Sequence, residues 1–133
     1  MPERPADTAP CPCRSGETFA GCCGPRLDGT GPAPTAAALM RSRFTAFAVG
    51  DAGYLLRSWH PRTRPRTLTL DPEQRWLYLE IARTERGGPF DTTGVVEFRA
   101  HYRSDGRRGV LHECSEFARV DNAWAYVEGD IEL

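Results

Sequence analysis

The second half of the chain alternates between apolar and polar side chains, which is the pattern of β-strands with one buried face. The alternation predicts four consecutive strands, over residues 76–86, 93–104, 109–120 and 123–128. Asp105-Gly106 and Asp121-Asn122 supply turn residues between the last three strands, which favours antiparallel hairpins. A shorter strand is expected ahead of them over residues 67–70. These segments predict a largely antiparallel sheet.

The alternation also assigns side chains to the two faces of this sheet. The first strand divides into one face with Leu77, Leu79 and Ile81 and another with Trp76, Tyr78 and Glu80. His112 and Glu113 are adjacent in the third strand, so they should point to opposite faces, and only one of them can enter a given pocket. Glu97 and His101 are expected on a solvated face that carries cross-strand ion pairs.

A first helix is predicted ahead of the strands. Thr35 is a suitable N-cap for it, and Gly50 stands where a helix of this length ends. Met40, Phe44 and Phe47 are spaced at i, i+4 and i+7 within it. This spacing places them in one apolar stripe, which should face the core.

A second, shorter helix should follow, with Asp51 as its N-cap. It ends by about Ser58, because Pro61 disfavours helical geometry at His60. Helices followed by consecutive strands predict an α+β fold, in which the helices pack on one face of a curved antiparallel sheet.

The 133 residues suffice for one such domain and a small appendage. Residues 1–10 are expected to be a disordered tail, residues 25–34 a Gly/Pro-rich linker without regular structure, and residues 35–133 the α+β domain. No apolar stretch approaches the ~20 residues that a membrane span requires, so membrane insertion is not expected.

The charges of the chain are nearly balanced. All seventeen basic residues are arginine, and the formal net charge is -1. This balance lacks the basic excess of nucleic-acid-binding proteins, which disfavours that class of partner. Six arginines fall between Arg41 and Arg66, and six acids fall between Leu111 and Leu133. If these two segments pack together, their charges pair; otherwise the first offers an anion-binding face.

Four of the five cysteines lie within residues 11–24. Cys11 and Cys13 are separated by one residue, and Cys22 and Cys23 follow as an adjacent pair. Four thiolates satisfy the tetrahedral coordination of Zn²⁺ and leave no position for a substrate. The segment therefore predicts a structural zinc knuckle that holds one ion.

A disulfide framework is the alternative for four cysteines in a small protein. A bridge between Cys22 and Cys23 would be strained, and the remaining bridge between Cys11 and Cys13 would close a very small loop. The first ten residues contain no apolar stretch of a signal peptide, so we expect a reducing, cytoplasmic environment. Cys114 lies alone on a predicted strand, where a buried small side chain is favoured over a nucleophile.

The run Cys-Pro-Cys-x-Ser-Gly-x-x-Phe-x-x-Cys-Cys-Gly resembles the SEC-C zinc motif. Further along, the YchJ family of uncharacterised bacterial proteins is similar to this chain at Ala38–Phe44, Ser58–Pro61, Leu111–Glu113 and Trp124–Asp130. The resemblance implies a SEC-C zinc knuckle followed by a domain of the nuclear-transport-factor-2-like (NTF2-like), or cystatin-like, fold. It also implies the four cysteines as zinc ligands, and it carries no established activity.

The SEC-C motif was first known from the tail of the SecA translocation motor. The resemblance therefore implies contact with protein partners such as the SecB chaperone or the ribosome. This chain departs from the motif at Arg14, which stands where the motif usually has glycine. Arg14 lies beside the ligands, so we expect it to offset part of the negative charge of the sulfurs.

A cone-shaped sheet covered by helices leaves room for a pocket at its wide end. The candidate pocket residues are Tyr54, Trp59, His60, Arg64, Glu113, Trp124 and Tyr126. Trp59 and His60, at the helix exit near Arg62 and Arg64, would suit an anionic or aromatic ligand. A packed Trp and a hydrogen-bonded structural His are the plainer interpretation. His112, Glu97 and Asp130 complete the polar candidates.

Two functions from different classes follow from these features. The first is a non-enzymatic interaction module, in which the zinc knuckle contacts a protein partner. The second is a small-molecule-binding protein or enzyme that uses the pocket of the α+β domain. The sequence contains no phosphate-binding loop, nucleophile elbow or zinc-hydrolase helix motif, which disfavours catalysis.

Overall fold

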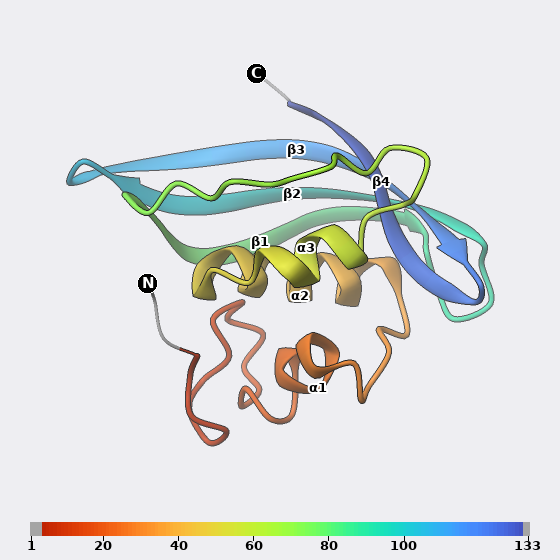
Figure 1. Cartoon of the computed structure of the whole chain (residues 1–133), viewed down its shortest axis with the longest axis horizontal. Helices are drawn as coiled ribbons and strands as arrows, with labels where there is room; N and C mark the ends of the chain where they lie inside the picture. Colours follow the sequence, from red (N-terminus) through yellow and green to blue (C-terminus); the bar gives the residue numbers. More distant parts are fainter. Residues whose placement is uncertain (1–3, 132–133) are drawn as a thin grey trace.

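A computed structural model describes residues 4–131, so residues 1–3 of the predicted tail and residues 132–133 of the predicted domain lie outside the described part. The elements are α1 (Cys23–Asp28), α2 (Ala36–Val49), α3 (Ala52–Arg57), β1 (Gln74–Arg86), β2 (Thr93–Ser104), β3 (Arg107–Val120) and β4 (Ala123–Ile131). The cysteine segment and α1 form one layer, α2 and α3 the next, and the sheet the third (Figure 1). The predicted α+β class is therefore confirmed. None of the helices in residues 4–131 is long and apolar enough to cross a bilayer.

α2 forms where its capping residues and apolar stripe predict it. The Thr35 Oγ1 accepts a hydrogen bond from the Ala38 amide at 3.0 Å, and Gly50 ends the helix with φ 78°. Met40 and Phe44 are buried, and Phe47 packs against the core at the edge of the stripe. The helix thus presents its predicted apolar face to the sheet.

α3 is capped by Asp51, whose Oδ1 accepts from the Tyr54 amide at 2.9 Å. The chain then leaves the helix and pairs with β4. The His60 amide donates to the Tyr126 carbonyl at 2.7 Å, and the Tyr126 amide donates to the Ser58 carbonyl at 2.9 Å. This pairing fixes the exit turn against the sheet.

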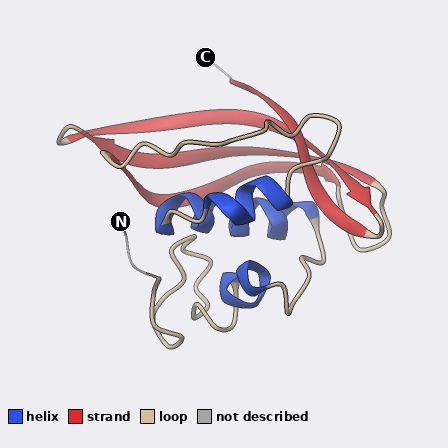
Figure 2. Cartoon of the chain, viewed as in Figure 1, coloured by secondary structure: helices blue, strands red, loops and turns tan. Residues whose placement is uncertain are grey.

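The sheet is an antiparallel meander in the order β1-β2-β3-β4, and the helices lie on one side of it (Figure 2). Its register shifts between Trp76 and Tyr78, so Leu77 is an additional residue in β1. Such bulges bend a strand and change the face of the residues before it. Trp76 consequently joins the helix-facing side, where its ring meets Phe44. Its assignment to the face of Tyr78 was wrong for this reason.

Three further predictions were wrong. Residues 67–70 form an extended loop rather than a strand, and residues 25–28 of the predicted linker belong to α1 (Cys23–Asp28). Within the described part of the tail, Pro10 pairs with Thr18 as an isolated bridge, and Arg4 forms an ion pair of 2.7 Å with Asp28. The tail is ordered here because it hydrogen-bonds to the cysteine segment.

The face of the sheet away from the helices carries the predicted ion pairs. Glu97 accepts from His112 Nε2 at 2.7 Å and from Arg83 Nε at 3.1 Å, and His101 lies 3.0 Å from Glu80. The hydrogen bond from His112 lowers the pKa of Glu97. This arrangement confirms that the face is solvated and that His112 and Glu113 point to opposite sides.

Arg119 holds the β1–β2 and β3–β4 turns together. Its guanidinium packs over the Trp124 ring, 4.4 Å from the centroid. It donates at 2.6 to 3.3 Å to the carbonyl oxygens of Gly88, Pro89, Asp91 and Asn122. One side chain therefore satisfies four acceptors of two turns.

Replacing Arg119 by methionine is expected to lower the free energy of unfolding by about 2–3 kcal/mol, because charged hydrogen bonds are lost and carbonyl groups remain unpaired. Arg107→Met is the matched control, since Arg107 is exposed; it should change stability by less than about 0.5 kcal/mol. Urea unfolding of both variants measures the difference. Equal midpoints would show that the turns hold without Arg119.

Candidate functional site

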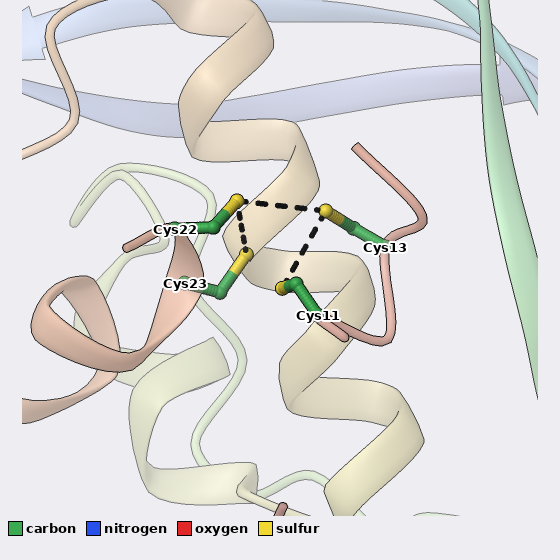
Figure 3. A group of neighbouring side chains, drawn as sticks. All are labelled: Cys11, Cys13, Cys22 and Cys23. Carbon is green, nitrogen blue, oxygen red and sulfur yellow. Dashed lines mark hydrogen bonds between the residues drawn. The ribbon is translucent and has the colours of Figure 1, made fainter. Parts of the chain in front are cut away.

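The fold brings the four cysteines of the N-terminal segment together. Cys11 and Cys13 come from one loop, and Cys22 and Cys23 from the start of α1, with all four side chains directed at a common centre (Figure 3). The four sulfur atoms lie within 4.8 Å of one another, and all four residues are buried. The cysteines are thiols rather than disulfides.

The spacing of these sulfurs matches tetrahedral coordination. Adjacent Sγ atoms lie 3.6 Å apart for Cys11 and Cys13, 3.7 Å for Cys13 and Cys22, and 3.8 Å for Cys22 and Cys23. A metal–sulfur distance of about 2.3 Å gives a regular tetrahedron with edges of about 3.8 Å. The four thiols are therefore spaced as the ligands of one metal ion.

Backbone hydrogen bonds shape the loop that carries the first two thiols. The Cys11 amide donates to the Glu17 carbonyl at 3.0 Å, and the Arg14 amide donates to the Cys11 carbonyl at 2.9 Å. Phe19 is fully buried beneath the loop, and its carbonyl accepts from the Gly24 amide at 2.8 Å. A Cβ on Gly24 would lie 2.8 Å from that carbonyl oxygen. The close approach requires glycine at this position.

Arg14 adopts a left-handed backbone conformation with φ 62°. Glycine reaches this region without steric cost, which explains why the SEC-C motif usually has glycine there. The guanidinium that contacts a thiol belongs instead to Arg26, whose Nη1 lies 3.9 Å from Cys22 Sγ. Ser15 Oγ lies 3.2 Å from the same sulfur. The expected charge compensation therefore comes from Arg26 on α1 rather than from Arg14.

Because the thiols lie close together, their pKa values differ from one another. The hydrogen bond between the Cys11 and Cys13 thiols lowers the pKa of Cys13 far below the usual range of a thiol. The contact with Cys13 raises the pKa of Cys11, and the contact with Cys11 raises that of Cys23. A bound dication would stabilise all four thiolates together, so metal binding releases protons.

The cysteine segment also rests against the helices of the domain. Cys11 Sγ lies 3.7 Å from Thr45 Oγ1 on α2, and Arg41 Nη1 on the same helix donates to the Cys13 carbonyl at 3.4 Å. On α3, Arg57 Nη2 donates to the Leu27 carbonyl. The cysteine cluster is thus attached to α2 through one thiol side chain and one backbone carbonyl.

The structure separates the seven candidate pocket residues. Trp59, Glu113 and Tyr126 line one internal cavity between α2 and the sheet. Tyr54 and Trp124 line a different, open groove beside α1. His60 and Arg64 lie outside the cavity, and Arg64 donates to the Trp59 carbonyl at 2.8 Å through Nη2. Asp130 is exposed near the end of β4.

The cavity has a volume of about 210 Å³. Its polar side chains are Arg43, Trp59, Glu113 and Tyr126. Its apolar walls are Met40, Phe44, Phe47, Leu68, Trp76, Phe98, Ala100 and Leu111. Arg43 was not among the predicted pocket residues. The available signal was its position between Met40 and Phe44 on an otherwise apolar helix face.

Comparison with known protein families matches two parts of the chain. Residues 35–129 match the YchJ middle NTF2-like domain, and residues 8–25 match the SEC-C motif. The UPF0225 protein of Streptomyces coelicolor is 58% identical over 123 residues, covering 92% of this chain and 96% of the relative. The UPF0225 protein of Chromobacterium violaceum is 49% identical over 125 residues, covering 91% of this chain and 92% of the relative.

Two solved structures share the fold. The solution structure of a SEC-C motif-containing protein from Rhodopseudomonas palustris superposes with a TM-score of 0.80 at 32% identity, covering 92% of this chain and 98% of that one. A crystal structure of a SEC-C motif-containing protein from Psychrobacter arcticus superposes with a TM-score of 0.74 at 23% identity, covering 95% of this chain and 83% of that one. The predicted NTF2-like fold is confirmed.

Proposed function

This chain belongs to the YchJ family, and on that premise we propose that it is a zinc-binding, non-enzymatic adaptor whose SEC-C knuckle docks a protein partner. The partner class that the motif suggests is the ribosome or the secretion and chaperone machinery. The observation that carries the proposal is the set of four converging thiols, which supports a closed metal site beneath an exposed loop.

Zinc is the metal that this ligand set favours. Soft thiolates select Zn²⁺ over Mg²⁺ and Ca²⁺, and four of them complete its tetrahedral coordination. A closed site provides no position for water or substrate, so its role is structural. Thiols that bind a metal must stay reduced, which supports a cytoplasmic location.

The loop between the two thiol pairs is the surface that the metal would hold in place. Residues 14–18 are exposed, while Cys13, Phe19 and Cys22 on either side are buried. Arg14 and Glu17 give this loop one charge of each sign. A rigid, exposed loop of this kind presents a fixed pattern of charges and amides to a partner without an ordering cost on binding.

The proposal is tested with defined partners. Zinc-loaded protein is sedimented with purified ribosomes and, separately, passed over immobilised SecB. We expect one of these to retain the protein, and we expect the double variant Arg14→Glu/Glu17→Arg to reduce retention. Both residues lie outside the ligand set, so the zinc content should remain one ion per chain.

Arg107→Glu is the matched control, because it reverses one exposed charge at the start of β3. It should leave retention unchanged. If neither ribosomes nor SecB retain the zinc-loaded protein, these partner classes are wrong. If the charge-reversed loop is retained as well as the original, the knuckle is not the docking surface.

A further inference from the structure

The internal cavity contains a buried positive charge. Arg43 is only 3% exposed, and a buried charge is costly unless it is paired. Its Nη1 donates to the Leu55 carbonyl at 2.8 Å and to Ser58 Oγ at 2.7 Å. Within residues 4–131, no carboxylate forms an ion pair with this guanidinium. Burial lowers the pKa of Arg43 to about 10, so it remains charged at neutral pH.

The guanidinium is held in a fixed place by aromatic rings. It lies 4.4 Å from the Tyr126 ring centroid and 5.0 Å from the Trp59 ring. In the described part of the chain, its hydrogen bonds to the protein run through Nη1 alone. The Nε1 of Trp59 is a second buried donor without a partner among these residues. The cavity thus has an oriented cation in one wall.

The remaining walls are apolar. Phe44 and Phe47 come from α2, Trp76 from β1, and Phe98 from β2. The Trp76 ring meets the Phe47 ring with centroids 5.8 Å apart. A cavity with mostly apolar walls and a few convergent polar groups is the usual form of a small-molecule site.

We propose that this cavity binds a small monocarboxylic acid with an aromatic or other apolar body, whose carboxylate rests on the Arg43 guanidinium. The guanidinium fork matches the two oxygens of a carboxylate. Among the described residues, no carboxylate lies within ion-pair distance of Arg43, although Glu113 lines the same cavity. The body of the acid fills the space between Phe47, Trp76 and Phe98. Amines are disfavoured because the same guanidinium repels them.

Glu113 shares this cavity and makes the binding sensitive to pH. Burial raises its pKa, Asp130 on β4 raises it further, and Arg43 on α2 lowers it. Tyr126 on β4 is the other titratable group beside it, and the facing residue of β2 is the uncharged Phe98. A second carboxylate would raise the pKa of Glu113 again, so binding takes up a proton. Affinity should therefore rise as the pH falls from 7.5 to 5.5.

The test uses 3-phenylpropionate and its neutral amide, 3-phenylpropionamide, with the unaltered protein. Trp59 and Trp76 line the cavity, so tryptophan fluorescence reports binding. We expect the acid to bind roughly tenfold more tightly than the amide, the usual difference between charged and neutral hydrogen bonds. Equal affinity for acid and amide would overturn the proposal, as would tighter binding of 3-phenylpropylamine or no binding of the acid at millimolar concentration.

Variants locate the site. Arg43→Met keeps the side-chain volume and should abolish the preference for the acid over the amide. Ala100→Leu adds bulk to the cavity wall without touching Arg43, and it should weaken both probes. If Arg43→Met does not fold, unchanged binding to Ala100→Leu would still overturn the assignment. Neither measurement involves the knuckle, so the adaptor proposal is tested independently.

Discussion

Replacing Cys13 by serine is expected to release the metal and to lower the free energy of unfolding by roughly 3–5 kcal/mol. This is a fraction of the ~10–16 kcal/mol of apparent zinc affinity in small zinc peptides, because three ligands remain. Cys13 is fully buried and lies beside two of the other ligands, so water cannot replace its sulfur without disturbing them. Zinc content and thermal unfolding with and without a chelator measure the effect.

Cys114→Ser is the matched control, because it removes the one cysteine outside the N-terminal segment. It should retain one zinc ion per chain and unfold within about 1 kcal/mol of the original protein. An unaltered protein that contains no zinc and unfolds at the same temperature with or without a chelator would contradict the metal site.

Replacing Phe44 by alanine is expected to lower the free energy of unfolding by about 3–5 kcal/mol. Phe44 is 1% exposed, and its ring meets Trp76 with centroids 6.0 Å apart and planes at 75°. The deletion removes a contact between α2 and β1 and enlarges a space that already exists beside it. Denaturant unfolding measures this loss as a lower midpoint concentration, with the dependence of the unfolding free energy on denaturant concentration unchanged.

Phe90→Ala provides the same chemical change at a site that is 99% exposed. Its expected effect is within about 0.5 kcal/mol, since no contact is lost. Similar losses for both variants would mean that the packing of α2 on the sheet contributes little to stability.

The features that the sequence predicted best depend on local chemistry. Thr35 and Gly50 delimit α2 because a cap and a left-handed terminus act on the nearest backbone groups. The thiol cluster was predictable because its ligands lie within one short segment and the chemistry of four sulfurs is restrictive. The spacing of the four cysteines in the sequence was enough to predict the cluster.

The features that the sequence did not predict depend on contacts between distant segments. The bulge at Leu77 arises from the register of β1 on β2, which moved Trp76 to the core. Arg43 is buried because Leu55 and Ser58 supply acceptors across the α2–α3 turn. α1 was missed because Pro25 suggested a loop, although proline is tolerated in the first turn of a helix.

α2 contacts both the four-cysteine cluster and the cavity between α2 and the sheet. Thr45 and Arg41 contact the cysteine segment, while Met40, Arg43 and Phe44 of the same helix line the cavity. If binding at each of two sites stabilises the same position of one helix, the affinity at each site depends on whether the other is occupied. This dependence is reciprocal. If both proposals hold, the factor by which metal binding strengthens the binding of an acid in the cavity equals the factor by which the acid strengthens the binding of the metal. Under positive coupling, an acid in the cavity would slow the removal of the metal by a chelator, and loss of the metal would lower the affinity for the acid.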